Sequence, residues 1–314
     1  MSKLVLSVFL IISSANAFAF AKPPPPQPPT NPPGYSVVTP ELGNKVVKNL
    51  MENYYDTRAN CGASHRSSYL CSGITLRGTQ PGNYHVWEPS PSSEKSGGVS
   101  FSYLRTDAKF SRLAYGYKSG FTIYPTFELV GSALDLEYLC FFPVDADTNR
   151  RDDAGCGAHT SYQSSSGECN AQGIYTDGQW VNHYNSTSSN GDNRDHHQCG
   201  FNIQYYYPNA TEFVASNFYQ GLQAMRDVSG QTHNKQNEIR IKTWDKSLGR
   251  QTPVQAFFYI DITGQEGLNE ARSYQQDFYN MYGLIKPVVK LDLPATWDDE
   301  ANLRSQWMIK VFNL

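Results

Sequence analysis

Six cysteines set the strongest limit on how this chain can fold. They are Cys61, Cys71, Cys140, Cys156, Cys169 and Cys199. An even number of cysteines in an exported protein favours disulfides, but six allow fifteen pairings and the sequence does not choose among them. Cys61 with Cys71 and Cys156 with Cys169 are the pairings that would close short loops. There is no Cys-x-x-Cys and no histidine pair at ligand spacing beside the cysteines, which argues against zinc, so we expect no metal.

The amino-terminal residues indicate export. Met1-Ser2-Lys3 is a short basic start, and residues 4–12 form an apolar run too short to span a bilayer. Small residues then follow in Ala15-Asn16-Ala17 and Ala19-Phe20-Ala21, at the positions that a signal peptidase reads. We therefore expect a secretory signal peptide over residues 1–21 and a mature protein that is secreted or periplasmic.

The proline content divides the mature chain into a linker and a domain. Residues 22–38 are rich in proline and should form an extended linker. Residues 39–314 are expected to form a single domain. Within it, the polar stretch at about 148–202 is expected to be a loop-rich insertion ordered by disulfides.

The composition argues against several classes of partner. The chain has 314 residues, a formal net charge of −3, 39% hydrophobic residues and 18% charged residues, as is typical of a globular protein. A net charge so close to zero gives no general attraction to nucleic acid or to an anionic membrane. No later apolar run is long enough for a transmembrane helix. We expect neither nucleic acid nor stable membrane insertion among its interactions.

The pattern of apolar residues predicts an α+β fold with mixed, mostly antiparallel sheets and flanking helices. Helices are expected at 39–55, 210–227 and 268–282, the last closed by Gly283, and a further one within 174–184. Strands are expected at 69–77, 99–104, 113–117, 121–127, 136–144, 238–244, 254–260 and 285–293. The strands 113–117 and 121–127 would form a hairpin.

Three short stretches, in this order, supply the chemistry needed to cleave NAD. Arg77-Gly78 ends a predicted strand, and a planar guanidinium suits a diphosphate. Ser100 and Ser102 share one face of the next strand, where their hydroxyls can orient a ribose. Gln236 and Glu238 open a later strand, again on one face. A carboxylate there would stabilise the positive charge that develops at the anomeric carbon as the nicotinamide–ribose bond breaks.

This order of motifs resembles the arginine–serine–glutamate class of ADP-ribosyltransferases and NAD glycohydrolases. The whole mature chain is also similar to the halovibrin family, secreted bacterial NAD glycohydrolases with a suggested kinship to ADP-ribosylating toxins. The similar segments are Cys-Ser-Gly-Ile-Thr-Leu-Arg-Gly-Thr at 71–79, Ser-Gly-Gly-Val-Ser-Phe-Ser-Tyr-Leu-Arg-Thr-Asp at 96–107 and Gln-Ala-Phe-Phe-Tyr at 255–259. The resemblance implies an ADP-ribosyltransferase-like core, NAD as substrate with no bound cofactor, and a possible host protein target.

The resemblance also implies roles for single residues. Arg77 would anchor the dinucleotide, Ser100 or Ser102 would orient the ribose and the glutamate, and Glu238 would be catalytic. Gln236 occupies the first position of the last motif, where glutamine rather than glutamate favours hydrolysis over transfer to arginine. The chain departs from the class at Phe101, which stands at the middle of the usual Ser-Thr-Ser.

The residues between the first two motifs allow two interpretations. His85 is a candidate for substrate contact, and Trp87 for stacking on nicotinamide or adenine. Alternatively, the two only anchor their loop. Asp145 and Asp147 resemble a fragment of a calcium loop but lack the full ligand series.

Two other functions compete with NAD cleavage. A secreted nuclease would use His85 with an arginine or lysine as acid and base, although the net charge speaks against it. A non-enzymatic surface-binding protein would use its loops rich in Tyr, Ser and Asn, and would need no cleft joining Arg77, Ser100 and Glu238. If Glu238 were remote from Arg77, the reserve carboxylates would be Glu128, Glu266 and Glu270.

Overall fold

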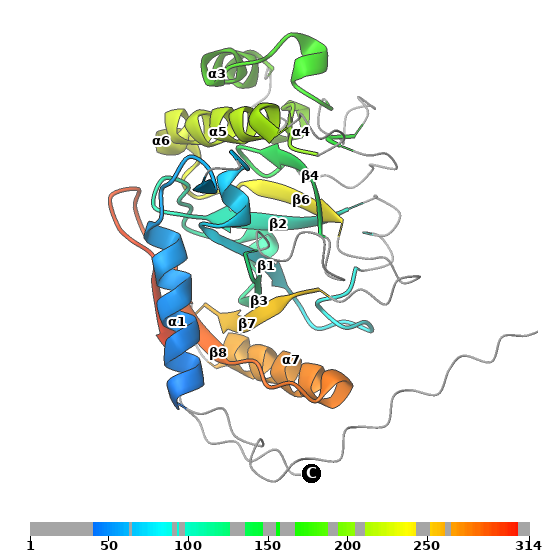
Figure 1. The fold of residues 1–314 in the computed structure, drawn as a ribbon, viewed down its shortest axis with the longest axis vertical. Helices are drawn as coiled ribbons and strands as arrows, with labels where there is room; N and C mark the ends of the chain where they lie inside the picture. The colour runs from blue at the N-terminus through cyan, green and yellow to red at the C-terminus, as the bar shows by residue number, and fades with distance from the viewer. Residues whose placement is uncertain are drawn as a thin grey trace, which may run out of the picture.

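The computed structural model describes residues 40–62, 65–89, 93, 98–125, 136–146, 155–157, 167–187, 194–204, 211–242, 252–260 and 265–306. The fold is α+β, as predicted, and its centre is a nine-stranded sheet in the order β5-β4-β6-β2-β1-β3-β7-β8-β9 (Figure 1). The predicted signal peptide and linker, at 1–21 and 22–38, lie outside the described residues.

The sheet is mixed and mostly antiparallel. Its strands are β1 (Ile74–Thr79), β2 (Val99–Leu104), β3 (Ser119–Ile123), β4 (Glu137–Phe142), β5 (Phe201–Asn202), β6 (Glu238–Lys242), β7 (Val254–Tyr259), β8 (Val288–Asp292) and β9 (Asn302–Ser305). Among these described strands, every neighbouring pair is antiparallel except β7 and β8. The prediction of a mixed, mostly antiparallel sheet is therefore confirmed.

Helices pack at both ends of the sheet and along one side. They are α1 (Pro40–Tyr55), α3 (Asp177–Ser186), α4 (Arg194–His197), α5 (Thr211–Asp227), α6 (Ser229–Thr232) and α7 (Glu266–Tyr282), with 3-10 turns at Ser68–Leu70, Ala114–Gly116 and Asn170–Gln172. In Figure 1, α5 lies beside β4, α3 lies outside α5, and α7 lies beside β7 at the opposite end. Phe218 of α5 packs on Tyr103 and Phe141, so this helix covers the apolar side of β2 and β4.

Most predicted elements are present, with shifted ends. The helix expected within 174–184 is α3, which begins after a capping box of Thr176 and Gln179. The prediction of a hairpin between 113–117 and 121–127 is wrong. Residues 114–116 form a 3-10 turn in which Tyr115 has φ 54° and Gly116 has φ 67°, and such a turn cannot be extended. The segment from Ser119 instead forms β3, which pairs with β1 and β7.

The strand β2 is divided between two neighbours. Its first half, Val99–Phe101, pairs with β6, and its second half, from Ser102 to Leu104, pairs with Ile74–Leu76 of β1. Beyond Leu76, the residues of β1 pair with β3. The strands β1 and β2 therefore part after the Leu76–Ser102 pair, and Arg77 is the first residue past the point where they separate.

All six cysteines form disulfides, which join Cys61 to Cys71, Cys140 to Cys156 and Cys169 to Cys199. The first is one of the short-loop pairings that the sequence favoured. The other short-loop pairing, Cys156 with Cys169, is not formed. Instead, Cys140 of β4 is joined to the segment after it, and Cys169 and Cys199 tie the insertion together beside β5.

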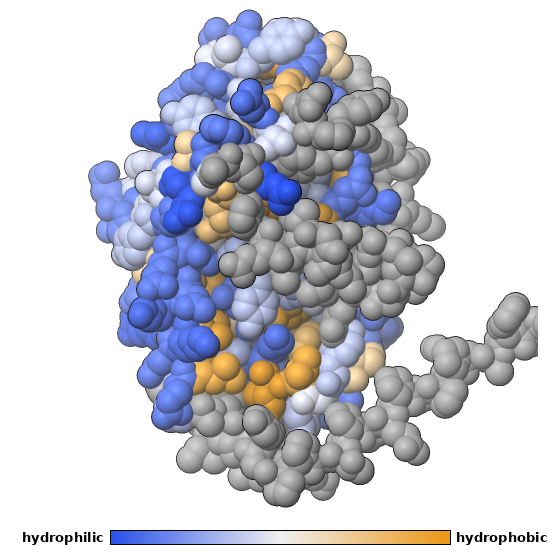
Figure 2. Space-filling model, viewed as in Figure 1, coloured by the Kyte–Doolittle hydropathy of each residue, from blue (hydrophilic) through white to orange (hydrophobic). Residues whose placement is uncertain are grey.

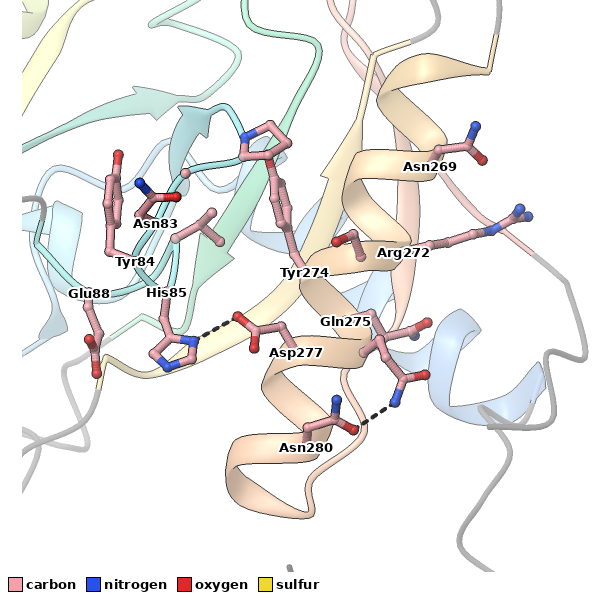
Figure 3. A pocket seen from close by; sticks show the side chains of 15 residues that line it. Asn83, Tyr84, His85, Glu88, Asn269, Arg272, Tyr274, Gln275, Asp277 and Asn280 are labelled. Carbon is pink, nitrogen blue, oxygen red and sulfur yellow. Dashed lines mark hydrogen bonds and ion pairs between the residues drawn. The ribbon is translucent and has the colours of Figure 1, made fainter. Parts of the chain in front are cut away.

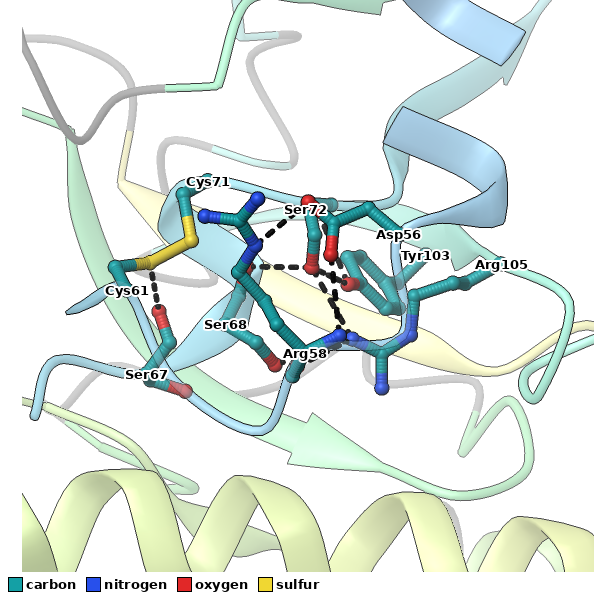
Figure 4. The surroundings of a disulfide bond; sticks show 9 residues. All are labelled: Asp56, Arg58, Cys61, Ser67, Ser68, Cys71, Ser72, Tyr103 and Arg105. Carbon is teal, nitrogen blue, oxygen red and sulfur yellow. Dashed lines mark hydrogen bonds and ion pairs between the residues drawn. A yellow bond between two sulfur atoms is a disulfide. The ribbon is translucent and has the colours of Figure 1, made fainter. Parts of the chain in front are cut away.

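The first disulfide lies next to a buried polar network at the start of β1 (Figure 4). Arg105 is 2% exposed; its Nε and Nη2 donate to Asp107 at 2.5 and 2.8 Å, and its Nη1 donates to Ser72 Oγ at 3.1 Å. Ser72 Oγ in turn lies 3.2 Å from the Tyr103 hydroxyl. The network therefore fixes the segment that enters β1 against the end of β2, five residues before Arg77.

One face of the molecule is largely hydrophilic where its residues are described (Figure 2). Hydrophobic residues gather in the lower part of this view, where Figure 1 shows β8 and α7. Within the described residues, none of the helices has both the length and the apolar character needed to cross a bilayer.

The disulfide Cys169–Cys199 should contribute more to stability than Cys61–Cys71, because it encloses 30 residues rather than 10. We expect the double variant Cys169→Ala/Cys199→Ala to lose about 3 kcal/mol of unfolding free energy, and about 1 kcal/mol more than Cys61→Ala/Cys71→Ala. Urea denaturation of the two variants beside the wild type measures this difference. Equal losses would mean that local packing, not chain closure, sets the contribution.

Candidate functional site

The strongest candidate carboxylate accepts hydrogen bonds from a serine hydroxyl and from a backbone N–H. Glu238, the first residue of β6, is fully buried. The Ser100 hydroxyl donates to its Oε1 at 2.6 Å, and the backbone N–H of Ala146 donates to its Oε2 at 3.2 Å. Because Ser100 pairs with Arg240 across the two strands, the side chains of Ser100, Arg240 and Glu238 share one face of the sheet. The serine and the glutamate singled out in the sequence are thus in direct contact.

A clamp on the opposite face fixes the direction of this carboxylate. The Asn237 side chain is fully buried; its Oδ1 accepts from Tyr103 N at 2.8 Å and its Nδ2 donates to Tyr103 O at 2.7 Å. These two bonds turn Asn237 toward the backbone of β2. Since neighbouring residues of an extended chain point to opposite sides, Gln236 and Glu238 are both turned the other way.

Gln236 lies in an open hollow of about 410 Å³, which we call the Gln236 hollow. Its lining is formed by residues 112–116, Asp145, Asp195 and residues 234–236. Gln236 Oε1 accepts from Ala114 N at 3.1 Å, and Nε2 donates to Asp145 Oδ2 at 3.4 Å. Asp145 directly precedes Ala146, which donates to Glu238, so the hollow adjoins the carboxylate.

Arg77 carries a buried hydrogen-bond donor with no acceptor. Its Nη1 is buried and has no hydrogen-bond partner, and no described carboxylate forms an ion pair with it. Burial lowers the pKa of the Arg77 guanidinium from its ordinary value, while the nearby Tyr84 and Tyr117 act to raise it. Its carbonyl is closely approached by Gly120 of β3, where an added Cβ would lie 1.9 Å from that oxygen. A buried cation without an acceptor is the kind of group that an anionic ligand satisfies.

Arg77 and Glu238 lie two strands apart. The pairs Leu76–Ser102 and Ser100–Arg240 place their backbones about 10 Å from each other, twice the strand spacing. Strand alternation puts Arg77 on the face of Phe121 and puts Ser100 on the other face. Tyr117 lies close to Arg77 and to Asp145. Burial raises the pKa of its hydroxyl, Arg77 acts to lower it, and Tyr84 and Asp145 act to raise it.

The other predicted site residues have separate surroundings. Ser102 is 1% exposed and pairs with Leu76, so Ser100 is the serine of this strand that reaches the surface. Gly78 leaves room for Leu113 and Tyr117, whose side-chain atoms would lie 3.0 Å from an added Cβ. Phe101, between the serines, is a core residue that packs on Phe121.

His85 and Trp87 lie in a different place, beside α7. His85 Nδ1 is 2.7 Å from Asp277 Oδ2, and its ring stacks on Trp87 with centroids 5.1 Å apart. Trp87 is 2% exposed and its Nε1 donates to the Tyr282 hydroxyl at 3.3 Å. This geometry supports the interpretation in which the pair anchors its loop. Stacking of Trp87 on a base stays a prediction, and would require its ring to leave this packing.

This second region is also hollow (Figure 3), and we call it the Asp277 hollow. It measures about 970 Å³ and is lined by residues 81–86, Glu88, Asn269, residues 272–277 and Asn280. Tyr84 and Tyr274 belong to its lining, and the Tyr274 hydroxyl lies 3.5 Å from the carbonyl of Thr79, at the end of β1. The Asp277 hollow therefore reaches the end of β1, two residues beyond Arg77.

The reserve carboxylates are engaged elsewhere. Glu266 is paired with Lys118, and Glu270 accepts from Ser119 Oγ at 2.6 Å. Glu128, like Asp147, lies outside the described residues. Asp145 bonds to Gln236, and within the described ranges no group of three or more His, Cys, Asp or Glu side chains could hold a metal ion.

Three groups near the site were not singled out in the sequence. They are Tyr117, Asn237 and the Ala146 N–H. All three reach the site through contacts between segments far apart in the chain, and no local motif marks them. No protein-family model and no curated protein matches this chain, so its membership of the halovibrin family stays a prediction.

Tyr115 lines the Gln236 hollow in a strained conformation. It is 76% exposed, has φ 54°, and contacts the Tyr117 ring at 5.6 Å between centroids. A positive φ disfavours any residue with a Cβ except asparagine and aspartate. We expect Tyr115→Asn to raise the unfolding free energy by about 1 kcal/mol in urea denaturation. The variant Tyr175→Asn, at another exposed tyrosine without this strain, serves as the control and should show no gain.

Proposed function

We propose that this protein is an NAD-consuming enzyme that cleaves the nicotinamide–ribose bond, with water as the preferred acceptor of ADP-ribose. The observation that carries the proposal is the buried, unpartnered Nη1 of Arg77, on the strand next to the one that holds Ser100 against Glu238. A buried donor without an acceptor costs about 1–3 kcal/mol. A diphosphate supplies acceptor oxygens and a negative charge that would offset this cost.

The second support is the arrangement of Ser100 and Glu238. In this proposal the nicotinamide riboside end of NAD reaches the face of β2 that carries Ser100. As the C1′–N bond breaks, nicotinamide leaves with the bonding electrons and positive charge develops on the ribose ring. The Glu238 carboxylate stabilises that charge, and Ser100 holds the carboxylate in place. Water then adds to the anomeric carbon and gives up a proton, which leaves ADP-ribose.

Glu238 has no exposed surface, whereas Ser100 is exposed. Direct contact between substrate and the carboxylate therefore requires a displacement of Ser100 or of the segment around Ala146, which donates the second hydrogen bond. Each of these bonds is a single contact, one to a surface hydroxyl and one to a loop, whereas the Asn237 clamp on the other face is doubled.

Gln236 bears on the choice between hydrolysis and transfer. Its amide bonds to Ala114 and Asp145, and it has no charge with which to attract an arginine of a target protein. We therefore propose hydrolysis as the main reaction. Transfer to a host protein is the alternative outcome, and a search for ADP-ribose attached to protein in the same reactions distinguishes the two.

The role of Glu238 can be tested with purified protein and NAD. We expect Glu238→Gln to lower the rate of nicotinamide release about 100-fold or more, because the charge that stabilises the oxocarbenium ion is lost. Ser100→Ala should lower it about tenfold, because it removes one charge-assisted hydrogen bond. Glu266→Gln, which removes an exposed carboxylate paired with Lys118, is the matched control and should keep the wild-type rate. Folding of each variant is checked by circular dichroism.

The proposal is contradicted if the wild type releases no nicotinamide, or if a folded Glu238→Gln variant releases it at the wild-type rate. Degradation of RNA by the wild type would instead favour the nuclease. Binding of neither NAD nor ADP would favour the non-enzymatic surface-binding protein.

Arg77 offers a test that separates a functional from a structural role. Replacing it by methionine, which has a similar length and no charge, removes a buried donor that has no partner. We expect Arg77→Met to raise Tm while it raises KM for NAD about tenfold with a smaller effect on kcat. A structural arginine would behave in the opposite way, with a clear fall in Tm.

A further inference from the structure

The Asp277 hollow adjoins Arg77 through two tyrosines. Tyr84, which lines the hollow, acts on the charge of Arg77, and the Tyr274 hydroxyl lies at the carbonyl of Thr79, two residues further along β1. Tyr117 interacts with Arg77 and with Asp145, which lines the Gln236 hollow. Arg77 is therefore close to residues of both hollows, although it lines neither. A ligand that is anionic at its centre can place one end in each.

The lining of the Asp277 hollow is that of a site for a polar, ring-containing group. Amides are contributed by Asn83 and Asn280, an aromatic ring by Tyr84 and a carboxylate by Asp277 (Figure 3). Amide side chains can both donate to and accept from the edge of a base, and a tyrosine ring offers a stacking surface. The volume of about 970 Å³ lies at the upper end of the range for small-molecule sites.

Asp277, whose side chain is 44% exposed, is oriented by a hydrogen bond to one of its two carboxylate oxygens. Its Oδ2 lies 2.7 Å from His85 Nδ1, and no described group bonds its Oδ1. His85 stacks on Trp87, which is buried and bonded to Tyr282. The direction of the carboxylate is thus fixed by a chain of packed rings. A fixed carboxylate of this kind binds the hydroxyls of a ribose in dinucleotide sites and repels a phosphate at the same position.

We propose that the Asp277 hollow binds the adenosine half of NAD, with Asp277 accepting a hydrogen bond from the 2′-hydroxyl of its ribose. The inference rests on the proposed function, in which Arg77 holds the diphosphate. It assigns to His85 a positioning role through Asp277 and makes the site selective for NAD over NADP. Arg272 also lines the hollow, but in Figure 3 it extends from the side of α7 opposite to Asp277.

The test compares nucleotides that differ only at the 2′ position. Calorimetric titration of the full chain should show that ADP binds about tenfold more tightly than 2′-deoxy-ADP, since one hydrogen bond to a charged group is lost. Asp277→Asn should reduce this ratio to about one and improve the use of NADP relative to NAD. ADP and 2′-deoxy-ADP carry the same charge, so the ratio of their affinities does not depend on the general repulsion between Asp277 and an anionic ligand. Asp298→Asn, which removes an exposed carboxylate outside the hollow, should keep the wild-type ratio.

His85→Ala keeps the Asp277 carboxylate but removes the hydrogen bond that orients it, so the preference for ADP over 2′-deoxy-ADP should become smaller without disappearing. His85→Gln should restore part of this preference. If the wild type binds ADP and 2′-deoxy-ADP equally, the inference is overturned even when Asp277→Asn does not fold. If the protein releases nicotinamide but binds ADP no more tightly than 2′-deoxy-ADP, this inference is wrong and the proposed function stands. If the protein binds ADP more tightly than 2′-deoxy-ADP but releases no nicotinamide, the proposed function is wrong and this inference stands.

Discussion

The double pairing of β2 is the constraint on which the rest of the structure depends. One half of this strand bonds to β6 and the other half to β1, so it joins the two groups of strands that make up the sheet. The Asn237 side chain reinforces this junction by bonding both backbone groups of Tyr103. Because the two neighbours attach to different halves, Arg77 and Glu238 are brought within two strand spacings while β1 and β2 are free to separate between them.

Two residues at the candidate site have arrangements whose unfavourable free energy a well-packed core would not tolerate. Arg77 keeps a buried donor without an acceptor, and Tyr115 keeps a backbone angle that a tyrosine disfavours. Tyr115 lines the Gln236 hollow, and Arg77 interacts with Tyr117, whose ring contacts that of Tyr115. Groups of this kind persist when the surrounding structure enforces them, and they concentrate where proteins bind ligands. The stability of this chain is therefore expected to be lowest where the proposed chemistry takes place.

Local pattern predicted much of the fold and part of the site. The alternation in Val99–Leu104 predicted a strand there, because strand period is a property of a few adjacent residues, but the pairing of β2 with β6 that brings Ser100 to Glu238 joins distant segments. The hairpin at 113–117 failed because an apolar run does not reveal the positive φ of Tyr115. Asp277 and Tyr117 could not be found in advance, since their neighbours at the site come from distant segments. Trp87 looked accessible in a polar loop, whereas α7, far along the chain, buries it.

The disulfide of Cys140 and Cys156 has a consequence for when the site becomes complete. It ties β4 to the chain that comes after it, and Ala146, which bonds Glu238, lies between the two cysteines. In a reducing compartment the thiols would stay apart and that loop would lose its covalent tie. The segment that donates the Ala146 N–H would then be joined to the fold without this cross-link. Maturation of the site is thereby coupled to the redox state of the compartment in which the chain folds.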